Sequence, residues 1–126
     1  MESLNISGNK KSPEIAFEPF SGMLVIKGKS SLENPSKFYD PVINWLEGYS
    51  KDPAIKTTFR MEMDYFNSSS AKHLMRIFRV LEFIAKDEKK EVVVQWCHDD
   101  HDHSMQESGE DYASMLKLNF EYVELE

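Results

Sequence analysis

Hydrophobic and polar residues alternate up to Tyr65 and then follow a helical period, so a strand is predicted to lead directly into a helix. Phe59, Met61, Met63 and Tyr65 occupy alternate positions, the two-residue period of a half-buried strand. The following apolar residues recur three and four positions apart, which is typical of a helix with one buried face: Ala71, Leu74, Met75, Phe78, Leu81 and Ala85. We expect the strand to lie inside a sheet and the helix to begin within two residues of Ser69.

The remaining segments alternate between strand and helix patterns. Residues 1–12 are expected to be a disordered leader, and residues 13–126 a single domain. The other expected elements are a hairpin over 13–19 and 23–27, a helix over 36–51, a buried strand over 92–97, a weaker helix over 102–116 and a strand over 117–125. The order β-β-α-β-α-β-α-β contains three crossovers, which favour mostly parallel pairing with an antiparallel first strand. The patterns predict a small α/β sandwich with a mixed five-stranded sheet and three helices.

Composition narrows the classes of partner and compartment. The chain has 126 residues and a formal net charge of -7, so a nucleic-acid backbone would be repelled. No apolar run approaches the ~20 residues that cross a bilayer, and residues 1–12 lack the apolar core of a signal peptide. Cys97 is the only cysteine, which agrees with a reducing compartment. We therefore expect a cytoplasmic protein that binds neither nucleic acid nor membrane.

Four residues with short polar side chains separate the central strand from its helix: Asn67, Ser68, Ser69 and Ser70. Their side-chain oxygens can accept hydrogen bonds from the free N–H groups of the first helical turn, so one of them is expected to be the N-cap. A hydroxyl at the positive end of a helix dipole, on a surface turn, is also well placed to carry a phosphate. These residues alone leave both interpretations open.

The segment after the buried strand contains three of the four histidines: His98, His101 and His103. With Asp102 they form a ligand set that suits zinc, so a metal-binding protein is the alternative function. Adjacent ligands on a loop lack the spacing that directs several donors at one ion, and a solvated acidic loop is the preferred interpretation.

No catalytic or nucleotide-binding motif is found. Cys97 and His98 are neighbours on a predicted strand, so their side chains point to opposite faces and cannot form a nucleophile-base pair. The stretch from Gly28 to Ser31 lacks the spaced glycines of a phosphate-binding loop, and its lysine precedes its serines. We therefore predict no catalytic residues and no cofactor.

Several motifs together resemble the SiaC family of bacterial regulatory phosphoproteins over about residues 13 to 125. They are Tyr65-Phe66-Asn67-Ser68-Ser69-Ser70 followed by Lys72, Val92-x-Val94-x-Trp96, Glu107-x-Gly109-Glu110, Gly28-x-Ser30-x-x-Glu33-Asn34, Phe38-Tyr39 and Trp45-Leu46-x-x-Tyr49. The resemblance implies a STAS-like two-layer sandwich and a protein that is not an enzyme.

The resemblance also implies partner switching. In this family a Ser/Thr kinase phosphorylates the start of the central helix, a PP2C-type phosphatase reverses the reaction, and the unmodified form engages a diguanylate cyclase. The phosphorylated threonine of the family motif Tyr-Phe-Asn-Thr-Ser-Ser falls on Ser68, which keeps the hydroxyl. The loop over 98–103 is a departure, because it is more uniformly acidic in the family. A STAS-like scaffold that has lost its kinase is a third possibility.

Partners are expected to contact the surface around Ser68. That surface should include two neighbours in the junction and three exposed residues from the polar side of the helix: Asn67, Ser69, Lys72, His73 and Arg76.

Overall fold

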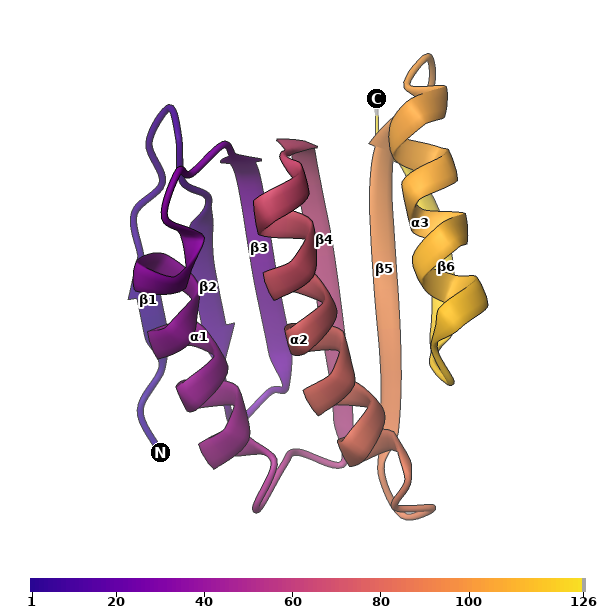
Figure 1. Ribbon diagram of the computed structural model, residues 1–126. Helices are drawn as coiled ribbons and strands as arrows, with labels where there is room; N and C mark the ends of the chain where they lie inside the picture. Colours follow the sequence, from indigo (N-terminus) through magenta and orange to yellow (C-terminus); the bar gives the residue numbers. More distant parts are fainter. Residues whose placement is uncertain (126) are drawn as a thin grey trace.

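The computed structural model describes residues 1–125 as a single six-stranded sheet covered on one face by three helices (Figure 1). The elements are β1 (Leu4–Ile6), β2 (Glu14–Glu18), β3 (Met23–Ser30), α1 (Pro35–Tyr49), β4 (Lys56–Phe66), α2 (Ser68–Ala85), β5 (Glu91–Asp99), α3 (His103–Met115) and β6 (Asn119–Leu125). The strands lie side by side in chain order, antiparallel from β1 to β3 and parallel from β3 to β6. The predicted α/β sandwich with a mixed sheet and three helices is confirmed.

The sheet has one strand more than predicted, because β1 lies within the segment expected to be a disordered leader. Leu4 pairs with Phe17 and Ile6 with Ile15, which adds an antiparallel edge strand beside β2. Leu4 and Ile6 are partly buried against the core. The expectation of disorder is therefore wrong at these residues. A three-residue strand is too short for its alternation to be recognised without its partner.

The parallel crossovers bring the carboxyl ends of β3, β4 and β5 to the same end of the sheet, at the top of Figure 1. Each of these strands leads through a short connection into a helix, so α1, α2 and α3 all begin at this end of the sheet. In open sheets of this kind, binding sites form outside the carboxyl ends of the strands. The predicted strand-to-helix junction lies at the middle of this end of the sheet, with β4 inside the sheet and α2 starting at Ser68.

The core lies between the helices and the sheet. The apolar face of α2 is buried there as its period predicts, with Leu74, Ile77 and Phe78 fully enclosed. Trp96 on β5 is also fully buried. No helix within residues 1–125 has the length and apolar character needed to cross a membrane.

A bulge changes the last part of β4. Gly28 of β3 pairs with Met63, but the next residue, Lys29, pairs with Tyr65, so Asp64 has no partner in the register. Gly28 has φ +117°, a conformation that side chains rarely allow. The alternation of β4 therefore stops at Met63. Tyr65 is 51% exposed and departs from the predicted pattern, while Phe66 turns towards the core.

Candidate functional site at the start of α2

Asn67 is the N-cap of α2. Its Oδ1 accepts a hydrogen bond from the backbone N–H of Ser70 at 2.9 Å, which satisfies one of the free donors of the first turn. Its Nδ2 donates to the carbonyl oxygen of Leu32 at 3.1 Å, and its backbone N–H donates to that of Ser30 at 2.9 Å. Asn67 thus fixes the helix start against the loop after β3. None of the three serines serves as the cap.

Ser70 belongs to a buried chain of hydroxyl groups. Tyr39 Oη donates to Ser30 Oγ at 2.6 Å, Ser30 Oγ donates to Ser70 Oγ at 2.7 Å, and Ser70 Oγ donates to the Ser30 carbonyl oxygen at 3.2 Å. Burial raises the pKa of Tyr39 to about 12, against the smaller lowering by its bond to Ser30, so the phenol remains a donor at neutral pH. Ser30 and Ser70 are fully buried, which places the Ser70 hydroxyl out of reach of a modifying enzyme.

This chain makes a prediction for stability. Ser70→Ala removes the acceptor of the Ser30 hydroxyl in a place that water does not reach, which should lower the free energy of unfolding by about 1–3 kcal/mol. Ser69→Ala is the matched control, because the Ser69 side chain is exposed, and it should change that energy by less than about 0.5 kcal/mol. Urea denaturation of the two variants measures both values. Equal stabilities would contradict the role given to the buried chain.

The two exposed serines lie on different sides of α2. Ser68 is three, four and seven positions before Ala71, Lys72 and Met75, so the four share one helix face. That face is turned towards α3, since Tyr112 of α3 donates a hydrogen bond from Oη to the carbonyl oxygen of Ala71 at 2.8 Å.

Ser69 shares its face with His73 and Arg76, and this face is turned towards α1. Arg76 Nη1 forms an ion pair with Asp40 Oδ1 of α1 at 3.0 Å, and both side chains are exposed. Positions 68, 69 and 70 therefore lie on the sides of α2 that face α3, α1 and the core, respectively.

His73 is more constrained than an exposed polar residue. Its Nδ1 lies 3.1 Å from the carbonyl oxygen of Ser69, its Nε2 lies 3.1 Å from Ser36 Oγ, and its ring stacks on Tyr39 at 5.6 Å. A carbonyl oxygen only accepts hydrogen bonds, so Nδ1 must carry a hydrogen. The prediction of an exposed His73 is corrected, because the ring is partly buried and links the start of α2 to α1.

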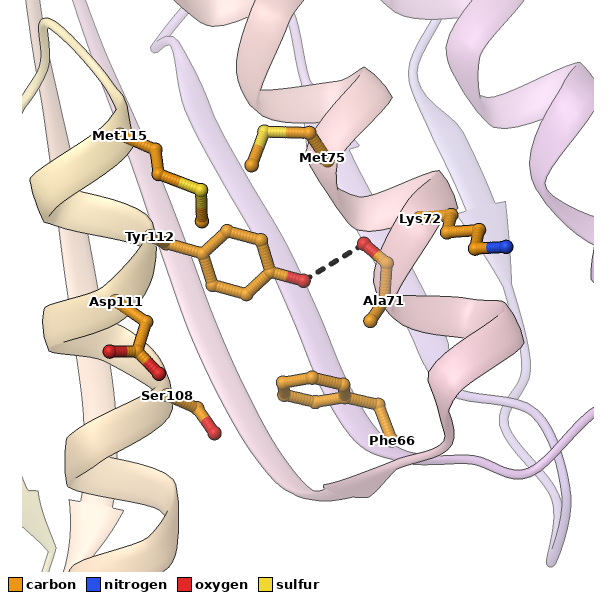
Figure 2. Close-up of a pocket in the computed structure, with 8 residues that line it drawn as sticks. All are labelled: Phe66, Ala71, Lys72, Met75, Ser108, Asp111, Tyr112 and Met115. Atoms are coloured by element: carbon orange, nitrogen blue, oxygen red, sulfur yellow. Dashed lines mark hydrogen bonds between the residues drawn. The ribbon is translucent and has the colours of Figure 1, made fainter.

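A groove of about 460 Å³ separates α2 from α3 beside this site (Figure 2). Figure 2 shows Tyr112 and Phe66 in the middle of the groove, with Met75 on one wall and Met115 on the other. The complete lining is Phe66, Ala71, Lys72, Met75, Ser108, Asp111, Tyr112 and Met115. The sequence pattern did not reveal this groove. Two of its lining residues, Ala71 and Met75, follow the helical period, which assigned them to the core.

The histidine loop does not form a metal centre within residues 1–125, where no three His, Cys, Asp or Glu side chains lie close enough to share an ion. The Asp102 carboxylate is the N-cap of α3 and accepts the backbone N–H of Met105 at 3.0 Å. His101 Nε2 faces Asp100 at 3.5 Å, and His98 Nδ1 lies 2.9 Å from the Asp99 carbonyl oxygen. These side chains are committed to local contacts or exposed to solvent.

Zinc should bind the segment from His98 to His103 only weakly, because the loop would lose conformational entropy and the α3 cap to collect its ligands. Titration of the protein with zinc in a calorimeter tests this expectation. Stoichiometric binding of submicromolar strength that is lost in a His101→Ala, His103→Ala double variant would establish the metal site instead.

Comparisons with known proteins indicate the family and the fold of this chain. A family model described as SiaC family regulatory phosphoprotein matches residues 6–125. An uncharacterized protein of Pseudomonas aeruginosa strain UCBPP-PA14 is 29% identical over 120 residues, which cover 95% of this chain and 94% of that protein.

Two solved structures from Pseudomonas aeruginosa have the same fold. Apo-SiaC superposes with a TM-score of 0.89 at 26% identity, covering 98% of this chain and 99% of that one. SiaC bound to the diguanylate cyclase SiaD, of which it is the activator, superposes with a TM-score of 0.89 at 25% identity, covering 97% and 99%. The chain described here belongs to the SiaC family of regulatory phosphoproteins.

Proposed function

We propose that this chain is a cytoplasmic, non-catalytic bacterial signalling protein in which phosphorylation of Ser68 selects among partners. A Ser/Thr kinase adds the phosphoryl group and a PP2C-type phosphatase removes it. The unmodified form binds and regulates a downstream signalling enzyme such as a diguanylate cyclase. In support, SiaC of Pseudomonas aeruginosa forms a complex with the diguanylate cyclase SiaD, of which it is the activator. One observation supports this most directly: Ser68 is an exposed hydroxyl at the first position of a helix that another residue caps.

The neighbouring serines are weaker candidates for the modification. Ser70 is fully buried and hydrogen-bonded, so phosphorylation there would require the helix start to open. Ser69 is exposed, but its carbonyl oxygen holds His73 and its side of the helix faces α1. Ser68 alone among the three is both exposed and turned towards the groove beside α3.

The site can accept a phosphoryl group without losing its fold. A phosphate adds about -1.5 to -2 charges, and the free N–H groups of a helix start favour such an anion. Lys72 lies four positions later on the same face, and an acidic group followed by lysine at this spacing is the favourable orientation. Phosphorylation should therefore change the surface of the protein far more than its stability.

The proposed partner surface divides into contacting and positioning residues. Ser69, Lys72 and Arg76 are exposed and can touch a partner directly. Asn67 and His73 are partly buried and hydrogen-bonded within the protein, so they shape the surface rather than extend from it.

Co-expression with a Ser/Thr kinase from the same genome, followed by intact-mass measurement and peptide mapping, tests the proposal. We expect one added phosphoryl group, located on Ser68 and absent from Ser68→Ala. A phosphoryl group on Ser69 would move the site. No added mass would favour a STAS-like scaffold that has lost its kinase.

A further inference from the structure

The end of the sheet opposite Ser68 is built from the turn before β3 and from the connections that lead into β4 and β5 (Figure 1). We call it the lower end and define it by these connections with their flanking residues: 18–23, 50–56 and 86–91. Hydrogen bonds fix its backbone. The Ile55 carbonyl oxygen accepts the backbone N–H of Glu91 at 2.8 Å, and Lys90 Nζ donates to the Pro53 carbonyl oxygen at 2.8 Å. A partner that binds here therefore does not have to order the surface first.

Large apolar side chains are exposed at the lower end. Phe20 is 83% exposed and Ile55 is 77% exposed, the two highest values among such side chains within residues 1–125. They come from adjacent segments, because a Cβ atom on Gly22 would lie 3.1 Å from the Cβ atom of Ala54. Phe83, in the last turn of α2, is 62% exposed. Single exposed apolar residues are ordinary on protein surfaces, but several at one end of a molecule indicate an interaction site.

A hollow lies beside these projecting side chains. It has a volume of about 520 Å³ and is lined by the two longer connections and the end of α2: Ser50, Lys51, Asp52, Pro53, Phe83, Ile84, Lys86, Asp87 and Lys90. Ile55 follows Pro53 by two residues, so a projecting side chain and a hollow are neighbours on one surface. In a two-fold interface each copy uses the same patch, so the projecting side chain of each copy can enter the hollow of the other.

The charges of the lower end suit a second copy of the chain. They are five lysines and five carboxylates: Lys51, Lys56, Lys86, Lys89, Lys90, Glu18, Asp52, Asp87, Glu88 and Glu91. The lower end is therefore neutral, and the remaining residues carry the whole formal net charge of -7. Two copies repel each other over those remaining surfaces, whereas interspersed lysines and carboxylates can pair across a two-fold axis. Charge thus directs self-association to the lower end.

We propose that the lower end binds a second copy of this chain about a two-fold axis, with Ile55 of each copy in the hollow beside Phe83 of the other. The inference goes beyond the proposed function and does not depend on it. Ser68 lies at the opposite end of the sheet, so it stays exposed in both copies of the dimer. The dimer therefore carries two switch sites that point away from each other.

Sedimentation velocity of the full chain over a range of concentrations tests the dimer. The wild type should pass from monomer to dimer as its concentration rises. Ile55→Asp should raise the dissociation constant by about 100-fold or more, because each copy would bury an unpaired charge in the other. Tyr65→Asp is the matched control, since Tyr65 is 51% exposed but lies at the end of the sheet that carries Ser68. It should dimerise within about threefold of wild type. A wild type that stays monomeric up to its solubility limit overturns the proposal.

Distances between spin labels show which ends of the two copies meet. The label reacts with Lys89→Cys at the lower end or with Ser69→Cys at the other end, while the native Cys97 is buried and burial raises the pKa of its thiol. The eleven residues of β4 run the length of the sheet and span about 36 Å at 3.3 Å per residue. Electron–electron double resonance on the dimer should therefore give less than about 40 Å for the first pair and more than about 60 Å for the second. The reverse order overturns the lower end as the interface.

Two further variants separate this inference from the proposed function. Ser68→Asp should dimerise as the wild type does, because its added charge lies at the far end of the sheet. Ile55→Asp should accept a phosphoryl group and bind the target as the wild type does. If Ser68 proves not to be the switch, the dimer is unaffected. Equal losses of dimer in Ile55→Asp and Tyr65→Asp overturn the lower end and leave the switch in place.

Discussion

Ser68→Asp should weaken binding of the downstream enzyme by about 10² to 10³-fold, whereas Ser68→Ala should bind as tightly as the unmodified wild type. The reason is that a charge buried in an interface without a partner on the other protein costs about 3–5 kcal/mol. The exposed Lys72 offsets only about 0.2–0.5 kcal/mol of this cost, and each 1.4 kcal/mol is tenfold in affinity. Ser68→Ala keeps the surface uncharged and removes only the acceptor of the phosphoryl group. Titration calorimetry with the purified target measures the three affinities.

The same change should hardly alter the stability of the folded protein. The helix dipole stabilises an exposed anion at its start by only about 0.3–1 kcal/mol, so the melting temperatures of the three forms should lie close together. Ser21→Asp is the positional control. It adds the same charge to an exposed turn between β2 and β3, at the opposite end of the sheet from the start of α2, and should leave target binding unchanged. Equal target binding by wild type, Ser68→Ala and Ser68→Asp would remove Ser68 as the switch.

Gly109→Ala should destabilise the protein by about 1–2 kcal/mol, although alanine forms helices better than glycine. A Cβ atom at this position would lie 2.6 Å from Cδ1 and from Nε1 of Trp96. The indole cannot retreat, because it is fully buried and its Nε1–H is held at 2.9 Å by the carbonyl oxygen of Met105. Forcing extra volume into a packed core costs about 1–3 kcal/mol, more than the gain of up to about 1 kcal/mol in helix propensity.

Gly48→Ala is the matched control for this prediction. Gly48 also lies within a helix, but its Cβ would meet only the flexible end of Met1, at 3.4 Å from Cε. The same substitution there should stabilise the protein by up to about 1 kcal/mol. Urea denaturation of both variants gives the comparison. A stabilised Gly109→Ala would show that α3 can move away from Trp96. One wall of the groove between α2 and α3 would then be mobile.

The period of hydrophobic residues by itself determined the main elements. The alternation through Phe59 and Met61 and the helical repeat from Leu74 to Leu81 reflect which side chains can be buried together, and this depends only on spacing along the chain. The order of elements then limited the topology to right-handed parallel crossovers. For the same reason, the location of the junction at residues 67–70 could be predicted from sequence.

The roles within that junction required the tertiary structure. Asn and Ser are equally good caps, so sequence could not choose among positions 67 to 70. The choice depends on Ser30 and Leu32, more than thirty residues away, which bind Asn67 and draw Ser70 into the core. With these two residues committed, Ser68 and Ser69 remain exposed.

Other features were also decided by contacts between distant segments. Tyr65 is exposed because of a bulge opposite Gly28, and β1 exists because β2 offers an edge for it. The sequence of a segment does not indicate which distant strand it pairs with, so neither feature could be predicted from its own residues. The groove between α2 and α3 has the same origin. The separation of two helices on a sheet is set by the strands that they follow and by the large side chains, such as Tyr112, that pack between them.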